Sequence, residues 1–351
     1  YGALFVPMVA AAIAASAAGG LLVLRWGLKR LLLAGVLLDV LAMGLTALSA
    51  AFMGAHVPSY VILLVAMLAL GGGFGSTLTA LNSLAPGFFP DHGEAALTAL
   101  HTLLGAGTAL APVFVTAASG RTWWWIPAVV GAFLLLLAAA GATQPLTIDA
   151  AAPSLPSGGP FALLGAISGR LWAFVGLVAL YGISETLFGN WAILYLRGEQ
   201  RLPAREAGLA LTAFWAMVTL GRLAVAMTTV RFPPRLIYRA LPVLLLAAFL
   251  AVPHAATPGS AIAAFGLAGL ACSAFLPLSV GFAEEQFPRL AELMAGELIA
   301  AYMFGYGIAS FAVGPLVDSG AMRLSAIYSW ASVVAAVMIV MAFLLTRPRR
   351  A

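Results

Sequence analysis

The chain has 351 residues, of which 63% are hydrophobic and only 8% charged, with a formal net charge of +5. A soluble globular protein has about 45–50% apolar and about 25% charged residues. The composition therefore excludes a soluble domain and predicts a polytopic membrane protein whose surroundings are the lipid bilayer. The single cysteine, Cys272, excludes an intramolecular disulfide and a multi-cysteine metal site.

Eleven apolar runs are long enough to cross a bilayer, which takes roughly 20 helical residues. They cover residues 2–24, 31–53, 59–86, 95–118, 123–142, 171–196, 206–230, 236–253, 259–283, 293–316 and 324–345. A stretch with Pro, Ser and Gly separates the first five runs from the last six, which is typical of a linker. We therefore predict an all-α chain with an N-terminal bundle at 1–142, a cytoplasmic linker at 143–169 and a C-terminal bundle at 170–351. Because the chain opens inside an apolar run without Met, we expect a preceding first helix to be missing.

Arginine and lysine lie mainly at the ends of these runs, eleven on one set of connections and five on the opposite set. The positive-inside rule places the richer set, with the linker and the C-terminus, in the cytoplasm. Membrane topology thus accounts for the basic charge, and we expect no nucleic-acid partner. The preference for Arg, Ala, Gly and Leu suggests a GC-rich bacterial genome, so we expect the bacterial inner membrane.

The two halves share spaced features in the same order, which indicates an internal duplication of a transporter half. Gly71 and Phe89-Pro90 in the first half are spaced like Gly269 and Phe287-Pro288 in the second. Arg25 and Lys29 correspond in the same way to Arg231 and Arg235. The stretch TALAP at 108–112 is similar to FAVGP at 311–315.

The stretch GLLVLRWGLK after the first run resembles the GxLxDRxGRK motif of the major facilitator superfamily, with Leu24 at the acidic position. The matching residues are Gly20, Arg25, Gly27 and Lys29. This resemblance implies two six-helix bundles, makes the first visible run the second helix, and assigns Arg25 and Lys29 to a gating motif. The GGGFG stretch at 71–75 lacks the Lys-Ser/Thr of a phosphate loop, so we expect it to permit close helix contact.

Three longer segments are similar to the fucose-permease-like branch of sugar:proton symporters. They are ALHTLLGAGTALAPVF at 99–114, ETLFGNWAILYL at 185–196 and FWAMVTLGRL at 214–223. The resemblance implies proton-coupled transport of a small sugar-like solute by a monomer, without cofactor. The stretch LTALNS at 78–83 resembles the branch's fourth helix, but Leu78 stands at the carboxylate position. The branch's coupling residues are therefore not transferred to this chain.

Glu185 lies inside an apolar run, where a charge costs at least about 2.5–3.5 kcal/mol. It follows Arg170 by fifteen residues, or roughly 22 Å along a helix, which places it past the bilayer midplane. Gly182 and Gly189 fall on its helix face and Tyr181 flanks it, so we expect a thin face open to substrate or water. Glu185 is either a proton carrier and substrate acceptor or a structural carboxylate bonded to a neighbouring helix.

Other polar and aromatic residues are candidates for substrate contacts. Asn190 and Trp191 join Glu185 only if the helix breaks near Gly189. Asn82 either binds a hydroxylated ligand or bonds between helices. The aromatic residues that would flank or stack on a sugar, or pack between helices, are Tyr181, Trp191, Trp215, Tyr302 and Tyr306.

Four further titratable or charged residues lie within the apolar runs. We expect Arg222 and Glu297 to pair, as a cytoplasmic gate or in packing, because each alone is costly. Asp39 is interpreted first as a structural hydrogen-bonding residue and second as a proton-coupling residue. His101 either exchanges protons, given an unperturbed pKa near 6.5, or packs between helices.

The sequence leaves two rivals to a sugar-like symporter. One is a proton-driven exporter of amphipathic compounds, and the other is a receptor or scaffold on the same fold that does not transport. A membrane-embedded enzyme is not expected, because the sequence has no HExxH motif, no paired cysteines and no Ser-His-Asp order in a loop. The expected partners are a small-molecule substrate, protons and lipid.

Overall fold

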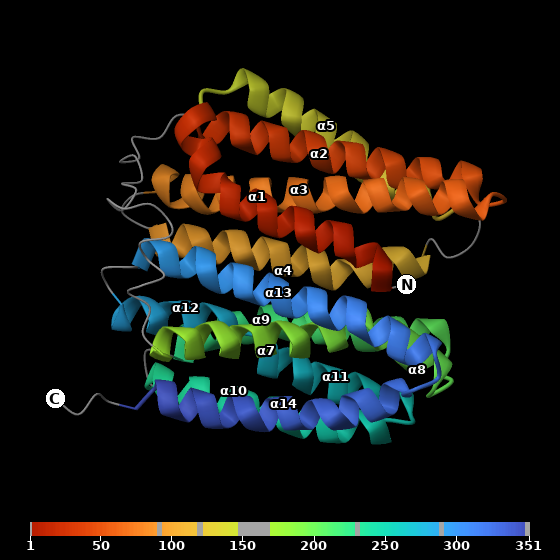
Figure 1. Ribbon diagram of the computed structural model, residues 1–351, viewed down its shortest axis with the longest axis vertical. Helices are drawn as coiled ribbons and strands as arrows, with labels where there is room; N and C mark the ends of the chain where they lie inside the picture. The colour runs from red at the N-terminus through yellow and green to blue at the C-terminus, as the bar shows by residue number, and fades with distance from the viewer. Residues whose placement is uncertain are drawn as a thin grey trace. The chain divides into compact units, whose positions relative to one another are not determined.

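The computed structural model describes residues 2–89, 93–117, 122–146, 169–228, 232–287 and 291–347. Helices account for most of these residues (Figure 1). The α-helices of the first half are α1 (Phe5–Trp26), α2 (Leu28–Ser49), α3 (His56–Phe88), α4 (Gly93–Ala117) and α5 (Trp125–Thr143). Those of the second half are α7 (Gly169–Asn190), α8 (Ala192–Gly198), α9 (Ala204–Thr228), α10 (Pro234–Ala251), α11 (Pro258–Cys272), α12 (Phe275–Gln286), α13 (Ala291–Asp318) and α14 (Leu324–Leu345). Short 3-10 turns lie at Gly2–Leu4, Ala50–Phe52 and Val252–His254.

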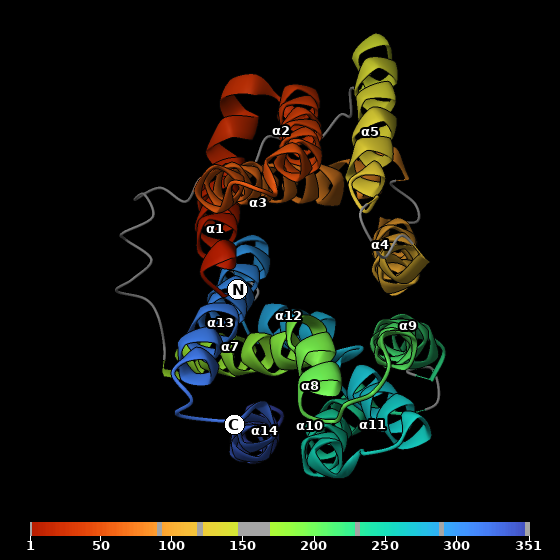
Figure 2. The same ribbon diagram turned by 90° about the vertical axis from the view of Figure 1, so that its right-hand side faces the viewer.

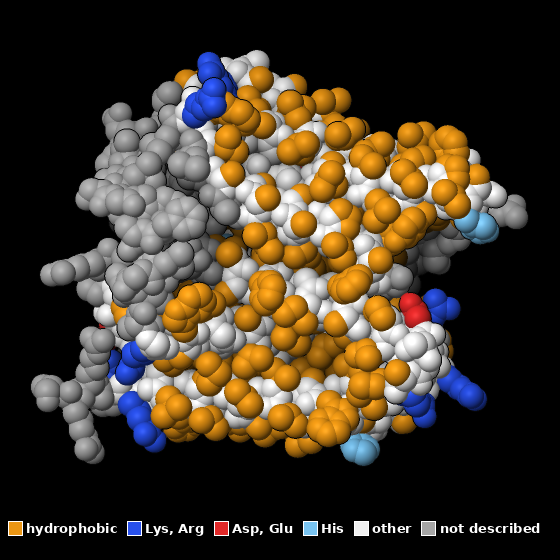
Figure 3. Space-filling view, viewed as in Figure 1, with side chains coloured by type: hydrophobic (Ala, Val, Ile, Leu, Met, Phe, Trp, Pro, Cys, Tyr) orange, Lys and Arg blue, Asp and Glu red, His pale blue; other side chains and the backbone are white. Residues whose placement is uncertain are grey.

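Nine stretches of the described helices are long and apolar enough to cross a membrane, and two shorter apolar helices lie at Gly2–Ser16 and Ala99–Val115. All of them fall on the eleven runs predicted from the sequence. Figure 3 shows the matching surface, with hydrophobic side chains over the visible face and Lys and Arg side chains at the helix ends. The chain is therefore a multi-pass membrane protein.

The chain divides into two compact units, residues 1–101 with 117–163, and residues 102–116 with 164–351. The second unit thus includes most of α4, which the sequence-based division placed in the N-terminal bundle. The predicted cytoplasmic linker at 143–169 stays a prediction, because residues 147–168 lie outside the described ranges.

In the first unit, α3 packs against both α1 and α2, and α2 packs against α5 (Figure 2). The glycine-rich stretch of α3 lies at the contact with α1. A Cβ at Gly71 would overlap the backbone of Met8, and one at Gly75 would lie 2.7 Å from the Ala12 carbonyl oxygen. The stretch permits close helix contact, as predicted.

In the second unit, α7 packs against α13 and α14, α9 against α11, and α10 against α11 and α14. Its core contains an aromatic cluster around Phe188 of α7. The Phe188 ring lies 4.8 Å from that of Phe249, 5.7 Å from that of Phe214 and 5.5 Å from that of Tyr328, measured between centroids. Such aromatic pairs contribute about 0.5–1.5 kcal/mol beyond the area they bury. This cluster holds α7 against its neighbours on one side.

On its other side α7 approaches α13 backbone to backbone. A Cβ at Gly182 would overlap the Tyr302 carbonyl oxygen, and a Cβ at Gly305 would overlap the Ala179 carbonyl oxygen. Small residues at both positions are what allow two membrane helices to come this close. The contact places Tyr302 of α13 beside the part of α7 that carries Glu185.

Two of the predicted runs are broken helices. The run at 171–196 forms α7 and α8, which are separated at Trp191. The run at 259–283 falls on α11 and α12, which are separated at residues 273–274. Non-helical backbone at membrane depth is tolerated only where protein or a water-filled cavity surrounds it. At the two breaks, side chains of the second unit must therefore form hydrogen bonds with the backbone groups that the helices leave unpaired.

Candidate proton and substrate site

Glu185 lies on α7 in the interior of the second unit, with only 5% of its surface exposed. Tyr181 and Tyr302 lie close to its carboxylate, and the positive charge of Arg222 acts on it electrostatically. These four residues come from α7, α9 and α13. The structure thus brings the buried Glu185 and Tyr181 together with the half-buried side chains of Tyr302 and Arg222.

The expectation that glycines expose Glu185 is wrong. The backbone of α13 fills the space beside Gly182, and a Cβ at Gly189 would lie 3.0 Å from the Trp215 ring. The glycines serve close packing, because each makes room for a neighbouring helix or ring. Glu185 is consequently enclosed by protein in this structure.

Tyr181 connects this cluster to the break between α11 and α12. Its hydroxyl donates to the Cys272 carbonyl oxygen at 2.9 Å. Its ring stacks on Phe275 with centroids 5.3 Å apart and lies 5.8 Å from the Tyr302 ring. Because Cys272 is the last residue of α11 and Phe275 the first of α12, Tyr181 contacts both sides of the break.

Arg222 of α9 satisfies the second carbonyl at the same break, since its Nε donates to the Ser273 oxygen at 2.9 Å. The local sequence explains why this oxygen is available. Pro277 stands four residues after Ser273 and has no backbone N–H, so the helical bond to Ser273 cannot form. The predicted partner of Arg222, Glu297, has a side chain outside the described residues, and that pair stays a prediction.

The break after Asn190 brings this residue into contact with α13. Its Nδ2 donates to the Tyr306 hydroxyl at 2.9 Å and to the Ser310 Oγ at 3.0 Å. The charge of Glu185 also acts on Tyr306. Trp191, in contrast, is 2% exposed and donates its indole N–H to the Ala309 carbonyl at 3.1 Å. Asn190 therefore extends the polar cluster, while Trp191 has the environment of a packing residue.

Asp39, Asn82 and His101 belong to the first unit. The Asp39 carboxylate accepts a hydrogen bond from Thr77 Oγ1 at 3.4 Å, between α2 and α3. Asn82 is half-buried, and its Oδ1 is buried without a hydrogen-bond partner among the described residues. His101 is half-buried on α4. Each of their roles stays a prediction.

The two basic residues of the motif-like stretch lie at the turn between α1 and α2. Gly27 forms this turn with φ +81°, a conformation that favours glycine. The Lys29 ammonium donates to the carbonyl oxygens of Ala142 and Gln144 at 2.8 and 2.7 Å, at the C-terminal end of α5. Arg25 is exposed. Lys29 thus caps a helix, where a cation also complements the helix dipole.

The sequence did not lead us to predict the break at 273–274 or the hydrogen bond that Ser310 accepts from Asn190. The signal for the break was Pro277, since a proline inside an apolar run frees a carbonyl one turn earlier. Ser310 carried no such signal, because an isolated serine in a membrane helix usually bonds within its own helix. No group of three or more potential metal ligands occurs in the ranges that the structure describes.

Comparisons with known proteins bear on the fold. No family model and no curated protein matches the sequence. The fucose:proton symporter of E. coli matches with TM-score 0.68 and 18% identity, covering 99% of this chain and 89% of the symporter. A second structure of that protein, described as a major facilitator superfamily transporter, gives a TM-score of 0.70. The chain has the major facilitator fold.

Two further structures with this fold support the assignment. The D-xylose-proton symporter matches with TM-score 0.72 and 15% identity, over 99% of this chain and 86% of the symporter. The nucleoside transporter NupG matches with TM-score 0.76 and 15% identity, over 99% of this chain and 90% of the transporter. The fold class predicted from the sequence is thereby confirmed. At such identities the likeness concerns the fold alone.

Proposed function

We propose that this facilitator-fold protein is a secondary active transporter that moves a small polar solute by alternating access, with Glu185 as its proton carrier. The observation that carries the proposal is the burial of Glu185 inside an apolar bundle, close to Tyr181, Tyr302 and Arg222. A buried carboxylate is expensive in a membrane protein and usually marks an ion or substrate pathway. The solved structures that share this fold are those of transporters.

A proton on Glu185 would change the contacts between helices. The charged carboxylate attracts Arg222 and can accept a hydrogen bond from the Tyr302 hydroxyl. The neutral acid loses most of that attraction, which frees Arg222 to interact with Ser273 alone. These residues lie on α7, α9, α13 and at the break after α11. Protonation of Glu185 would therefore change the side-chain contacts among these four helices. This is the physical link by which a proton gradient would drive a conformational change.

We infer a sugar-like, polyhydroxylated solute as the substrate. The amide of Asn190 and the hydroxyls of Tyr306 and Ser310 form a group of neutral hydrogen-bonding side chains next to Glu185. Such groups pair with hydroxyls, as do the carboxylate and the phenols of the cluster. The similar solved structures include transporters of fucose, D-xylose and a nucleoside. The proposed setting is the bacterial inner membrane, with a monomer whose linker and C-terminus are cytoplasmic.

Uptake into proteoliposomes tests the proposal. A panel of monosaccharides, nucleosides and amphipathic cations is offered with and without a proton gradient. We expect accumulation of one polar class that requires the gradient and is abolished by a protonophore. Gradient-driven movement of amphipathic cations alone would identify an exporter instead. Ligand binding without counterflow would identify a receptor and overturn the proposal.

A further inference from the structure

A second polar site lies at one end of the second unit, away from the Glu185 cluster. The ends of four helices meet there, namely the starts of α7 and α10 and the ends of α12 and α14. They enclose a cavity of about 200 Å³. The lining residues that carry the argument are Arg170, Arg235, Glu285, Gln286, Thr346 and Arg347.

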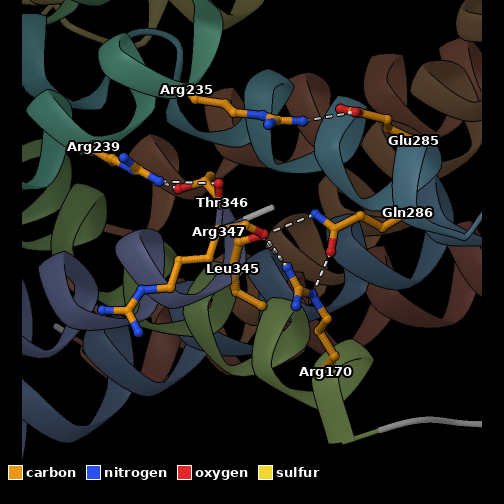
Figure 4. A network of polar contacts seen from close by, with 8 residues as sticks. All are labelled: Arg170, Arg235, Arg239, Glu285, Gln286, Leu345, Thr346 and Arg347. Carbon is orange, nitrogen blue, oxygen red and sulfur yellow. Dashed lines mark hydrogen bonds and ion pairs between the residues drawn. The ribbon is translucent and has the colours of Figure 1, made fainter. Parts of the chain in front are cut away.

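Arginines outnumber carboxylates among the described side chains at this cavity. Among the described residues, Arg170 donates to neutral acceptors, the Gln286 side chain and the Leu345 and Arg347 carbonyls (Figure 4). Arg239, beside the cavity, donates to Thr346 Oγ1 at 2.7 Å and to its carbonyl at 3.1 Å. These bonds place two guanidinium groups in fixed positions without neutralising their charge.

One ion pair is described among these residues. Arg235 Nη2 lies 3.2 Å from Glu285 Oε1, and both side chains are about half exposed. Four arginines, Arg170, Arg235, Arg239 and Arg347, thus stand with one carboxylate among the described residues at this end of the unit. An anionic group would offset part of this positive charge, and guanidinium is the side chain best suited to bind phosphate.

The surroundings of the cavity favour a lipid over a free anion. Large apolar side chains within two residues of the lining residues are exposed, Trp172 at 56%, Leu236 at 56% and Leu344 at 50%. The Arg239 guanidinium also lies over the Phe343 ring, 4.9 Å from its centroid. A phosphate held by the arginines would therefore sit at the edge of an apolar face that acyl chains can cover. Basic pockets between membrane helices are known to hold anionic headgroups.

We propose that this cavity binds the phosphate of an anionic phospholipid, with the headgroup among the arginines and the acyl chains along α7, α10 and α14. A bound headgroup would join the ends of four helices of the second unit. The site is independent of the proposed transport function, because none of its residues belongs to the Glu185 cluster.

The test uses the purified full chain in nanodiscs of phosphatidylcholine, with or without phosphatidylglycerol. Its readouts are the thermal unfolding midpoint and the number of retained lipids by native mass spectrometry. The test variant combines Arg235→Gln with Arg347→Gln, both exposed side chains. The matched control combines Arg197→Gln with Arg205→Gln, two exposed arginines of the same unit outside the cavity.

We expect phosphatidylglycerol to raise the midpoint of the wild type and of the control by a few degrees, since a ligand that binds only the native state stabilises it. The test variant should show less than half of that shift and retain fewer anionic lipids. An equal shift in the test variant would overturn the proposal. A separate titration of inorganic phosphate in detergent should leave the midpoint unchanged; a shift as large as that of the lipid would mean that the site binds free phosphate instead.

Discussion

The hydroxyl of Tyr181 on α7 donates to the carbonyl oxygen of Cys272, 2.9 Å away at the end of α11. This bond joins the helix that carries Glu185 to the broken helix whose next carbonyl is held by Arg222. Two side chains of the polar cluster therefore bond to consecutive backbone oxygens at the break. A rearrangement of the side chains around Glu185 would therefore change the contacts at the break, and a movement at the break would change the surroundings of Glu185.

Replacing Tyr181 with Phe should destabilise the protein by about 1–3 kcal/mol, because a buried carbonyl loses its partner. The measurement is the free energy of unfolding in detergent, followed by helix content. Tyr60→Phe is the control, since Tyr60 is 43% exposed and keeps its apolar ring in the variant. If both variants matched the wild type, the bond to Cys272 would not contribute to stability.

Glu185→Gln should abolish accumulation of substrate against a gradient while leaving exchange of substrate across the membrane. Glutamine keeps the shape and hydrogen-bonding capacity of the neutral acid but cannot release a proton. Accumulation and counterflow in proteoliposomes separate the two activities. Asp318→Asn, at an exposed position at the end of α13, should accumulate substrate like the wild type. A Glu185→Gln protein that concentrates substrate normally would refute the role of proton carrier.

Asp39→Asn offers a second contrast, since this carboxylate lies between α2 and α3 and bonds to Thr77. We expect uphill uptake to persist, because asparagine still accepts the bond from Thr77. Loss of uphill uptake with intact exchange would instead assign proton coupling to Asp39. The same accumulation and counterflow assays decide the matter.

Arg222→Met should lower stability by about 1–3 kcal/mol and abolish transport, because Ser273 loses its donor and Glu185 its cation. Pro277→Ala restores a backbone N–H one turn after Ser273 and allows the helix to close. In the double variant we therefore expect stability to recover while transport stays absent. Strictly additive losses of stability would show that Arg222 does not serve the Ser273 carbonyl.

Gly182→Ala should destabilise the protein by about 1–3 kcal/mol, since its Cβ would overlap the backbone of α13 at Tyr302. Backbone cannot move aside as a side chain can. Gly176→Ala on the same helix is the matched control, because its Cβ would meet only the flexible Met341 Cε at 3.8 Å. Thermal unfolding of the two proteins side by side measures the difference. Equal midpoints would mean that α7 and α13 separate easily.

The helices could be predicted from the sequence because transfer of apolar residues to a bilayer is nearly additive along the chain. The runs at 31–53 and 324–345 correspond to apolar helices in the structure for that reason. Glu185 stood out by the same argument, as a costly charge in an apolar run. The break at 273–274 was hidden because hydropathy does not change there, and only Pro277 pointed to it.

Hydropathy along the chain is enough to predict a multi-pass helical membrane protein and to reveal a few costly polar groups within its spans. Tertiary structure decided which of these groups meet. Arg222 acts on Glu185 and donates to the Ser273 carbonyl, Asn190 bonds to Tyr306, and Gly182 makes room for α13 instead of exposing the acid. The physical reason is that hydropathy is a property of each residue, whereas hydrogen bonds and charge contacts depend on the approach of helices far apart in the chain.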